Sequence, residues 1–267
     1  MVDRVVIDIQ NHVASVTLNR PNKHNAVDIA MFEAIIDAGE SLAKDRSLRA
    51  VVISGAGDSF CAGIDVSVFA GKGIGSAGAD NMAVRGSSLA NFYQSAAYVW
   101  RELPVPVIAA LNGVVFGAGL QIALGADIRY ASPSAKLSVM EIKWGIIPDM
   151  AISTTLPNLM AVDKAAELAW TGKVVSGTEA GELGLVTAVR ENPLESAMET
   201  AKAIAGKSPD AVRAIKKLLY KAWETDAANS LRLEAELQLK VMATPNQMEA
   251  ALANSENRMP DFGDAVI

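Results

Sequence analysis

A long uncharged stretch from Val105 to Ala126 constrains this chain more than any other feature of its sequence. Its length alone is enough to cross a bilayer, because a membrane-spanning helix needs about 20 apolar residues. A proline, an asparagine, a glutamine and four glycines interrupt the stretch, however, and Asp127 and Arg129 follow close behind it. Polar and helix-breaking residues at this density favour buried elements of a globular core, and we expect no membrane span.

The same stretch predicts a strand that leads through glycines into a helix. Val107–Leu111 has the apolar run of a buried strand, Asn112-Gly113 is a turn, and Ala118–Ala126 has the composition of a short buried helix. The first N–H groups of a helix have no partner inside it, so such a junction binds negative charge, including charge that develops only in a transition state. Two acids, Glu141 and Asp149, follow at short range. N–H donors with carboxylates close behind them are the outline of an active site.

Length and composition indicate a well-buried globular enzyme. The 267 residues are enough for one sizeable core, and 51% of them are hydrophobic while only 20% are charged. The formal net charge of −6 provides no basic surface, so we expect no nucleic acid as a partner. The single cysteine, Cys61, excludes an internal disulfide and fits a reducing compartment. No apolar signal-peptide segment follows Met1, and we expect a cytoplasmic protein.

The N-terminal part of the chain predicts the order strand, strand, helix, strand. Residues 4–9 and 13–19 alternate apolar and polar side chains around a turn, as in a β-hairpin. A cluster of turn-forming residues ends at Asn25, a candidate N-cap for a helix over residues 26–44. Residues 49–54 then have the pattern of a short buried strand that runs into a glycine loop.

Strand-strand-helix patterns return at residues 107–126 and, more weakly, at 129–141. Their repetition predicts an α/β protein with a coiled or layered core. Between the repeats, residues 71–86 are small, polar and rich in glycine, which is typical of a surface loop or lid. Residues 87–103 then predict a helix that Pro104 ends.

Helical patterns dominate the C-terminal part of the chain. Ser176 and Glu179 have the spacing of a capping box, and Thr244 is placed to cap the last helix. We expect residues 1–191 to form the catalytic α/β core and residues 192–267 a helical oligomerisation subdomain. Several of these helices are amphipathic without an obvious partner in the chain, which indicates a subunit interface. Helical periodicity marks residues 195–205, 209–225, 229–241 and 245–257.

The sequence contains no complete motif for a resident cofactor or a metal. Two Gly-x-Gly pairs, at residues 55–57 and 117–119, lack the third glycine of a dinucleotide fingerprint. His12 and His24 have no partners at metal-ligand spacing. A nucleophilic pair of Cys61 with His24 stays open, although a small cysteine beside alanine and glycine favours a packing role.

Several motifs, spread over nearly the whole length, resemble those of the crotonase family, the enoyl-CoA hydratase/isomerase superfamily. They are Phe60–Asp65 (FCAGID), Asn112–Leu120 (NGVVFGAGL), LNRPNKHNAV at residues 18–27, the run from Ala126 to Asp149, LGLV at 183–186, and EAALANSENRMPDFG at 249–263.

This resemblance implies a fold, a substrate class and an assembly. The fold is α/β, a crotonase-like spiral of repeated strand-strand-helix units with a C-terminal helical subdomain. The substrate is an acyl-CoA thioester, so coenzyme A is part of the substrate and no separate cofactor is expected. The C-terminal helices of the family mediate assembly, which implies a homotrimer or a dimer of trimers.

The resemblance also implies an oxyanion hole built from two main-chain N–H groups. The first belongs to Ile64, which follows the Ala-Gly pair, and the second to Ala118 in the glycine loop. A proton beside a thioester is too weakly acidic to remove unless the resulting enolate oxygen is stabilised. Each such donor contributes typically ~3–4 kcal/mol to the transition state.

The acids depart from the hydratase pattern. Hydratases of the family carry two glutamates that share a water; Glu141 matches the second, whereas Gln121 occupies the position of the first. An amide does not accept a proton at neutral pH. Asp149 matches instead the second acid of the family's dienoyl-CoA isomerases, which also carry an aspartate where this chain has Gln121. In the other interpretation, Asp149 caps a helix over residues 151–156.

We therefore expect a double-bond shift in an enoyl- or dienoyl-CoA. One of Glu141 and Asp149 removes a proton from the acyl chain, and the other returns one further along. The first alternative is a 2-enoyl-CoA hydratase that uses Glu141 with a water positioned by Gln121. The further alternative is a non-catalytic acyl-CoA-binding relative. Asp65 is expected to hold its loop in place.

Coenzyme A is expected along two short segments. The resemblance places the adenine and the pantetheine beside the turn that contains Lys23, His24 and Ala26, and beside Ala62, with Gly117 at the substrate in the glycine loop. Lys23 is a candidate phosphate contact, and a solvated surface lysine is the alternative. The lysine that many relatives carry after the closing phenylalanine is absent, since Gly263 follows Phe262.

Overall fold

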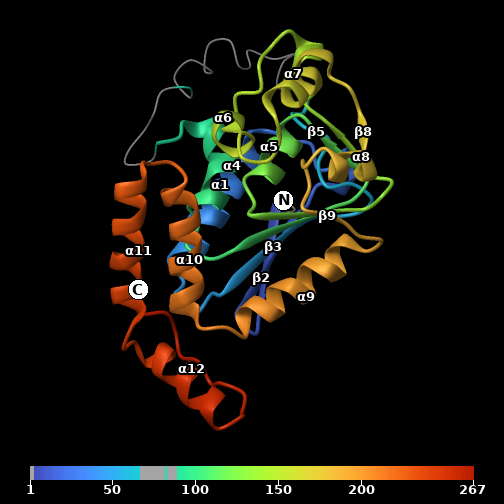
Figure 1. Ribbon diagram of the computed structural model, residues 1–267. Helices are drawn as coiled ribbons and strands as arrows, with labels where there is room; N and C mark the ends of the chain where they lie inside the picture. The colour runs from blue at the N-terminus through green and yellow to red at the C-terminus, as the bar shows by residue number, and fades with distance from the viewer. Residues whose placement is uncertain (1–2, 67–81, 83–88) are drawn as a thin grey trace.

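The computed structural model describes residues 3–66, Met82 and residues 89–267 (Figure 1). The segment predicted as a lid, residues 71–86, lies outside the described residues except for Met82. Among the described residues, none of the helices is long and apolar enough to span a membrane.

A six-stranded sheet forms the centre of the fold, with the strand order β1-β2-β3-β4-β6-β9. The first two strands form the predicted antiparallel hairpin, and all later neighbours pair in parallel. The strands are β1 Val5–Gln10, β2 Val13–Leu18, β3 Ala50–Gly55, β4 Val107–Leu111, β6 Ile128–Ala131 and β9 Ala188–Val189.

A second sheet of three short strands lies beside the first, in the order β5-β7-β8. Its strands are β5 Val114–Phe116, β7 Lys136–Ser138 and β8 Val175–Ser176. Strand β4 thus belongs to the large sheet and the next strand, β5, to the small one, and helix α5, Ala118–Leu124, follows. It repeats this order with β6, β7 and the 3-10 helix η3, Glu141–Trp144. The predicted spiral of strand-strand-helix units is confirmed.

Helices cover both faces of the large sheet. On β3, Val51 and Ile53 belong to the main core with helices α1, Ile29–Ala43, and α4, Phe92–Glu102, whereas Val52 belongs to a smaller core. This smaller core lies under helix α9, Pro193–Ala205, whose small residues Ala197, Ala201 and Ala205 let the helix approach the strands closely (Figure 1). Burial on both faces explains the continuous apolar run of β3.

Asn25 is not the N-cap of helix α1, and this prediction was wrong. Asp28 caps the helix by accepting a hydrogen bond from the N–H of Met31 at 2.9 Å. Asn25 is buried with φ +55°, and its side chain accepts from the N–H of Arg20 and donates to the carbonyls of Ala56 and Ser59. Its side chain therefore ties two loops together.

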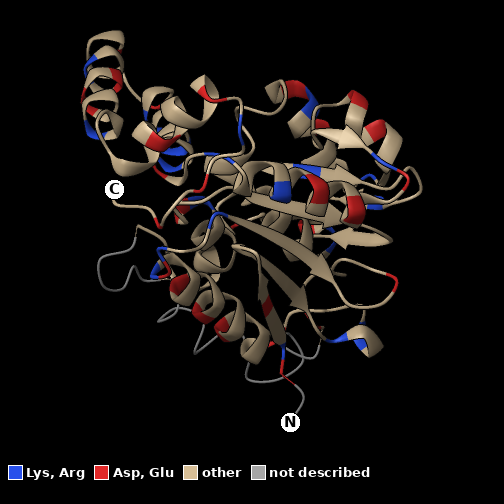
Figure 2. Ribbon diagram, turned by 90° about the horizontal axis from the view of Figure 1, so that it is seen from below, with Lys and Arg blue, Asp and Glu red and all other residues tan. Residues whose placement is uncertain are grey.

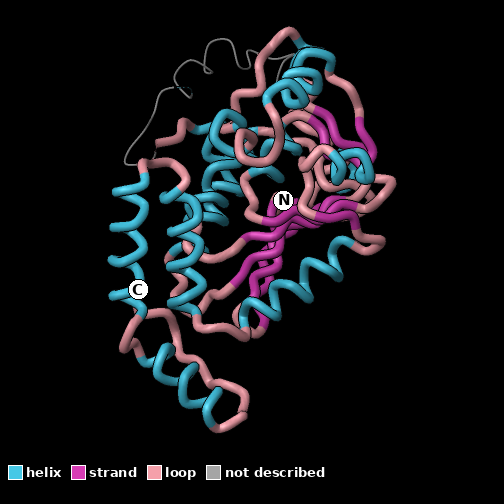
Figure 3. Tube along the Cα trace, in the orientation of Figure 1, coloured by secondary structure: helices cyan, strands magenta, loops and turns pink. Residues whose placement is uncertain are grey.

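The C-terminal helices begin at side-chain caps, including the predicted Thr244. Helices α10, Pro209–Ala222, and α11, Ala227–Val241, pack side by side, and α12, Pro245–Ser255, extends away from the rest of the molecule (Figure 3). Helix α9 packs on the sheet. The division of the chain at residue 192 into a catalytic core and a helical subdomain stays a prediction. The remaining short helices are η1 Pro21–Lys23, α6 Ile152–Thr155, α7 Val162–Thr171 and α8 Gly177–Glu182, the last with the predicted capping box.

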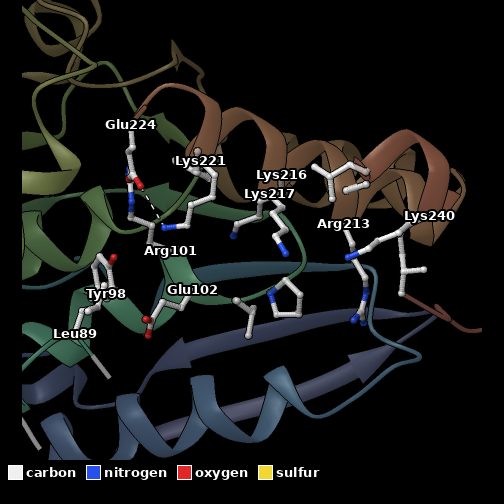
Figure 4. A pocket seen from close by; sticks show the side chains of 16 residues that line it. Leu89, Tyr98, Arg101, Glu102, Arg213, Lys216, Lys217, Lys221, Glu224 and Lys240 are labelled. Atoms are coloured by element: carbon white, nitrogen blue, oxygen red, sulfur yellow. Dashed lines mark hydrogen bonds and ion pairs between the residues drawn. The ribbon is translucent and has the colours of Figure 1, made fainter. Parts of the chain in front are cut away.

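Helix α10 is fixed to the sheet by a buried lysine. The Nζ of Lys216 donates to the Oδ2 of Asp127 at 2.8 Å and to the carbonyls of Trp100 and Val105. On the outside, Arg101 of α4 pairs with Glu224 at 3.2 Å, and both line a cavity of about 620 Å³ between α4 and α10 (Figure 4). Charged residues of both signs lie mainly on the helices, whereas the strands are largely uncharged (Figure 2).

Candidate active site

Two loops far apart in the sequence run side by side at the small sheet. Cys61 pairs with Val115 of β5: its N–H donates to the carbonyl of Val114, and its carbonyl accepts from the N–H of Phe116, both at 3.0 Å. The first loop then contacts the turn before α1. The N–H of Val27 in this turn donates to the carbonyl of Gly63 in the loop at 2.8 Å. These bonds hold the segment that ends in Ile64 against the segment that enters α5.

Glycines permit the close approach of these loops. Gly63 has φ +96°, and a Cβ there would lie 2.8 Å from the carbonyl oxygen of Phe116 and 3.8 Å from the nitrogen of Ala118. A Cβ on Gly119 would lie 2.4 Å from the carbonyl oxygen of Cys61. Real side chains do not tolerate such distances, so glycine is required at both positions. The structure therefore brings the main chain at Ile64 close to that at Ala118.

The N–H groups of Ile64 and Ala118 have no hydrogen-bond partner among the described residues. Ala118 is the first residue of α5, where an N–H has no acceptor within the helix. Both residues line a cavity of about 300 Å³. Two free N–H donors at one cavity form a site for an oxygen that carries negative charge.

Glu141 lies at the same cavity, at the start of η3. Its side chain abuts the glycine loop, since a Cβ on Gly117 would lie 3.3 Å from Oε1. The Nε2 of Gln121 donates to this Oε1 at 2.6 Å. The other oxygen, Oε2, is buried and has no hydrogen-bond partner in the part of the chain that the structure describes.

Burial raises the pKa of Glu141 above its ordinary value, because a carboxylate loses its hydration in this place. The charge of Asp149 raises this pKa further, while the hydrogen bond from Gln121 opposes the rise. Burial raises the pKa of Asp149 as well. Two neighbouring carboxyl groups with raised pKa values are typical of acid–base chemistry.

Asp149 does not cap the helix that follows, so this interpretation was wrong. Helix α6 begins at Ile152, and its N-cap is Ala151, with φ +66° and no side-chain cap hydrogen bond. Asp149 lines instead a second cavity of about 580 Å³, formed with residues of α1 and α4. The two cavities meet at Ile64 and Ile146, which line both.

The chain also matches known proteins over nearly its whole length. The sequence model of the enoyl-CoA hydratase/isomerase family matches residues 8–265. The chain belongs to this family. The human mitochondrial Delta(3,5)-Delta(2,4)-dienoyl-CoA isomerase is 32% identical over 95% of this chain and 79% of its own length. An enoyl-CoA hydratase of Mycobacterium tuberculosis is 29% identical over 96% of this chain and 95% of its own length.

Solved structures of the family have the same fold. The crystal structure of an enoyl-CoA hydratase from Bacillus anthracis superimposes with a TM-score of 0.89 at 31% identity, covering 97% of this chain and 98% of that one. An enoyl-CoA hydratase from Mycobacterium smegmatis gives a TM-score of 0.86 at 29% identity over 97% and 98% of the two chains. Relatives therefore include both hydratases and isomerases, and the reaction differs among members of the family.

The residues expected at coenzyme A lie in two places. Ala62 and Gly117 line the 300 Å³ cavity with the two free N–H groups. Lys23, the last residue of η1, and His24 directly after it are exposed, and Ala26 is half-buried. This turn is joined to the cavity by the hydrogen bond from the N–H of Ala62 to the carbonyl of His24, at 2.9 Å.

Cys61 and Asp65 have structural roles. The Sγ of Cys61 donates to the carbonyl of Asn25, and burial raises the pKa of this thiol to about 12. His24 contacts the hydroxyl of Ser59 at 3.1 Å, so no nucleophilic pair with Cys61 forms. Asp65 pairs with Arg20 at 2.6 Å and holds its loop, as predicted.

Sequence reasoning missed the residues that shape the larger cavity. Phe32 and Tyr93 line it, with ring centroids 5.3 Å apart, together with Gln94. In the sequence these positions have the helical spacing of core residues, so no signal separates a side chain that lines a cavity from one that fills the core.

Proposed function

We propose that this enzyme shifts a double bond in an enoyl- or dienoyl-CoA. The observation that carries the proposal is the placement of Glu141 and Asp149 at two adjoining cavities that meet at Ile64. An acyl chain that extends from one cavity into the other would pass both carboxyl groups. Proton removal at one carbon and proton return at another need such a pair. The similarity to dienoyl-CoA isomerases supports the same reaction.

In the proposed mechanism, the thioester oxygen lies between the N–H groups of Ile64 and Ala118. One of Glu141 and Asp149 takes a proton from the acyl chain, and the electron pair moves into the enolate, whose oxygen the two N–H groups stabilise. The electrons then return through the conjugated chain, and the other carboxyl group delivers a proton to a more distant carbon. The double bond has moved, and no atom is gained or lost. Each N–H donor contributes roughly 3–4 kcal/mol to the transition state.

Coenzyme A enters this proposal as part of the substrate, without a separate cofactor. Ala62 and Gly117 would contact the pantetheine and thioester end, since both line the cavity with the N–H donors. The turn with Lys23, His24 and Ala26 would contact the nucleotide end. Exposure of Lys23 leaves its ammonium available to a phosphate group.

The alternative is a 2-enoyl-CoA hydratase, which the family's solved hydratase structures and the buried Glu141 favour. In this reaction Glu141 would activate a water that Gln121 positions. One N–H of Gln121 and its oxygen are already bonded within the protein, so a water would bind through the second N–H of the amide. A non-catalytic acyl-CoA-binding relative is the further alternative, and it predicts binding without turnover.

We also propose a homotrimer, or a dimer of trimers, assembled through the C-terminal helices. Ile215 and Leu219 of α10, and Trp223 directly after its last residue, follow one another at intervals of four and are 54%, 46% and 69% exposed. An apolar stripe of this kind on one helix face is typical of a surface that another subunit covers.

One absorbance experiment separates the three functions. The enzyme is offered crotonyl-CoA, a 3-enoyl-CoA and a 3,5-dienoyl-CoA. The proposal expects conversion of the 3-enoyl or 3,5-dienoyl thioester into its conjugated isomer, and persistence of crotonyl-CoA. Loss of the crotonyl-CoA absorbance, with the other thioesters unchanged, would establish hydration instead. Binding of all three without turnover would establish the non-catalytic alternative.

A further inference from the structure

Gln121 occupies a buried position between Glu141 and the turn that carries Asp149. Its side chain is on α5, and the residue is 2% exposed. Its Nε2 donates to the Oε1 of Glu141 at 2.6 Å, and its Oε1 accepts from the N–H of Met150 at 2.8 Å. Met150 directly follows Asp149, so one amide contacts both the first carboxyl group and the turn that carries the second.

The orientation of this amide follows from chemistry. The N–H of Met150 can only donate, so the atom of Gln121 that faces it must be the oxygen. The NH2 group must then face Glu141, where it is a donor to a carboxylate. The reverse orientation would set two donors against each other at Met150.

This arrangement makes the two oxygens of Glu141 unequal. Oε1 receives the hydrogen bond from Gln121, whereas Oε2 is buried without a partner among the described residues. A carboxylate oxygen that already accepts a strong hydrogen bond is the weaker proton acceptor of the two. Oε2 is therefore the more basic oxygen of Glu141.

We propose that Gln121 is a positioning residue that holds the carboxyl group of Glu141 in a fixed position relative to the turn of Asp149. The oxygen of Glu141 that exchanges the proton is then Oε2. This inference rests on the proposed function, since it assumes that Glu141 transfers a proton at this cavity. It explains why an amide suits position 121: a neutral donor favours the ionised form of Glu141 over the protonated form. A carboxylate at the same distance would compete with it for one proton.

The first test replaces Gln121 by a side chain of similar length without hydrogen-bonding groups. In Gln121→Met, the carboxyl group of Glu141 and the N–H of Met150 both lose their partner. We expect kcat to fall roughly 10–100-fold with KM within about threefold, because the reacting groups lose their geometry while the coenzyme A contacts stay. The acid limb of the pH profile of kcat/KM should move up by roughly one to two pH units, because a hydrogen bond that favours the carboxylate is gone.

The second test keeps the shape and changes the charge. In Gln121→Glu, the new carboxylate can still accept from Met150 but lies against Oε1 of Glu141, and the two acids share a proton. We expect the acid limb to move further than in Gln121→Met, with activity recovering at high pH. Asp149 and Lys143 line the adjoining cavities and can also ionise. Both residues are the same in the two variants, so a difference between the pH profiles of the variants comes from position 121.

The outcomes separate the inference from the proposed function. Unchanged acid limbs in both variants, whether or not kcat falls, would overturn the positioning role, since a merely structural glutamine does not move a proton-transfer pKa. If the unsubstituted enzyme hydrates crotonyl-CoA and isomerises nothing, the proposed function fails. The pH comparison on hydration then still decides the role of Gln121, because Glu141 is the base there as well. Absence of turnover with every thioester would overturn both.

Discussion

The surroundings of Glu141 disfavour the ionised form of its side chain, and this makes the residue suitable for proton transfer. The side chain is 7% exposed, and burial together with the nearby charge of Asp149 raises its pKa above the ordinary value of 4.5. A base with a raised pKa holds a transferred proton more readily at neutral pH than a solvated carboxylate does. The hydrogen bond from the N–H of Gln121 opposes this rise of the pKa.

The substitution Glu141→Gln should abolish most activity and stabilise the fold. We expect kcat to fall by roughly 10²–10⁴-fold, the usual contribution of a positioned acid–base group. The folded protein binds this proton more tightly than the unfolded chain does, so the ionised Glu141 destabilises the fold once the pH rises above the ordinary value. The variant should therefore gain about 1 kcal/mol in free energy of unfolding at about pH 8 and nothing at about pH 4. Urea titrations at both pH values measure this difference, and a loss of stability at about pH 8 would contradict it.

The substitution Asp149→Asn tests the second acid. Because Asp149 caps no helix and burial raises its pKa, the variant should be at least as stable as the unsubstituted protein at about pH 8. Isomerisation of a 3,5-dienoyl-CoA should fall at least about 10²-fold, because one of the two proton transfers is lost. Thermal unfolding and initial rates measure the two effects. Retained isomerisation together with a loss of about 1 kcal/mol in the free energy of unfolding would indicate that Asp149 caps a helix after all.

At the scale of elements, the site depends on how closely the loop after β3 approaches the start of α5. The bonds from Cys61 to Val114 and Phe116 set this approach, and glycines at 63 and 119 permit it. Backbone packing, and not the side chains of Ile64 and Ala118, therefore brings the two N–H donors close together.

The substitution Gly119→Ala should separate these loops. A Cβ at this position would lie 2.4 Å from the carbonyl oxygen of Cys61 and 2.7 Å from its Cβ, so the backbone must move. We expect kcat/KM to fall roughly 10²–10³-fold, as when one oxyanion donor is lost, with a loss of stability of about 1–3 kcal/mol. Gly206→Ala is the matched control, since the nearest atoms to a Cβ there lie at 3.6 Å and φ is −80°. Equal activities of the two variants would contradict the role of this contact.

Most elements could be predicted from the sequence, because their signals are local. Strand β4 and the caps at Ser176 and Thr244 depend on a few adjacent residues, and the structure has them where they were expected. The cap predicted at Asn25 failed because tertiary contacts compete for this side chain. Helix α4 starts at Phe92, later than expected, because Asn91 and Gln94 form a capping box there.

The site was predictable only in part. The glycine pattern and the family resemblance point to Ile64, Ala118 and Glu141, which the structure places at one cavity. Two features were beyond the sequence: the double hydrogen bonding of Gln121, and the placement of Asp149 at an adjoining cavity. Both depend on how the turn at residues 146–150 folds back against α5, and no local pattern encodes that distance.

At the scale of the whole molecule, the C-terminal helices differ in how they contact the sheet. The sheet and α9 bury the core that positions the site, while α10 presents an exposed apolar stripe and α12 extends outward (Figure 1). Lys216 links the two parts through Asp127 and the carbonyls at the end of α4.

The assembly prediction belongs to this scale. Light scattering should give a mass of three or six times the 28.0 kDa chain. Trp223→Asp should shift the protein toward the monomer, because a charge on the apolar stripe opposes its burial. Thr178→Asp, which also adds one negative charge at an exposed position, is the charge-matched control. A monomeric unsubstituted protein, or an unchanged mass for Trp223→Asp, would contradict the interface on α10.

The most direct test of the central claim is the fate of deuterium when the enzyme converts a 3,5-dienoyl-CoA in heavy water. Two carboxyl groups that remove and return different protons predict a conjugated isomer with deuterium at the far carbon of the original diene and no added hydroxyl group. Glu141→Gln and Asp149→Asn should each form little of this product. A product heavier by one water, or a conjugated isomer without deuterium at that far carbon, would contradict the account.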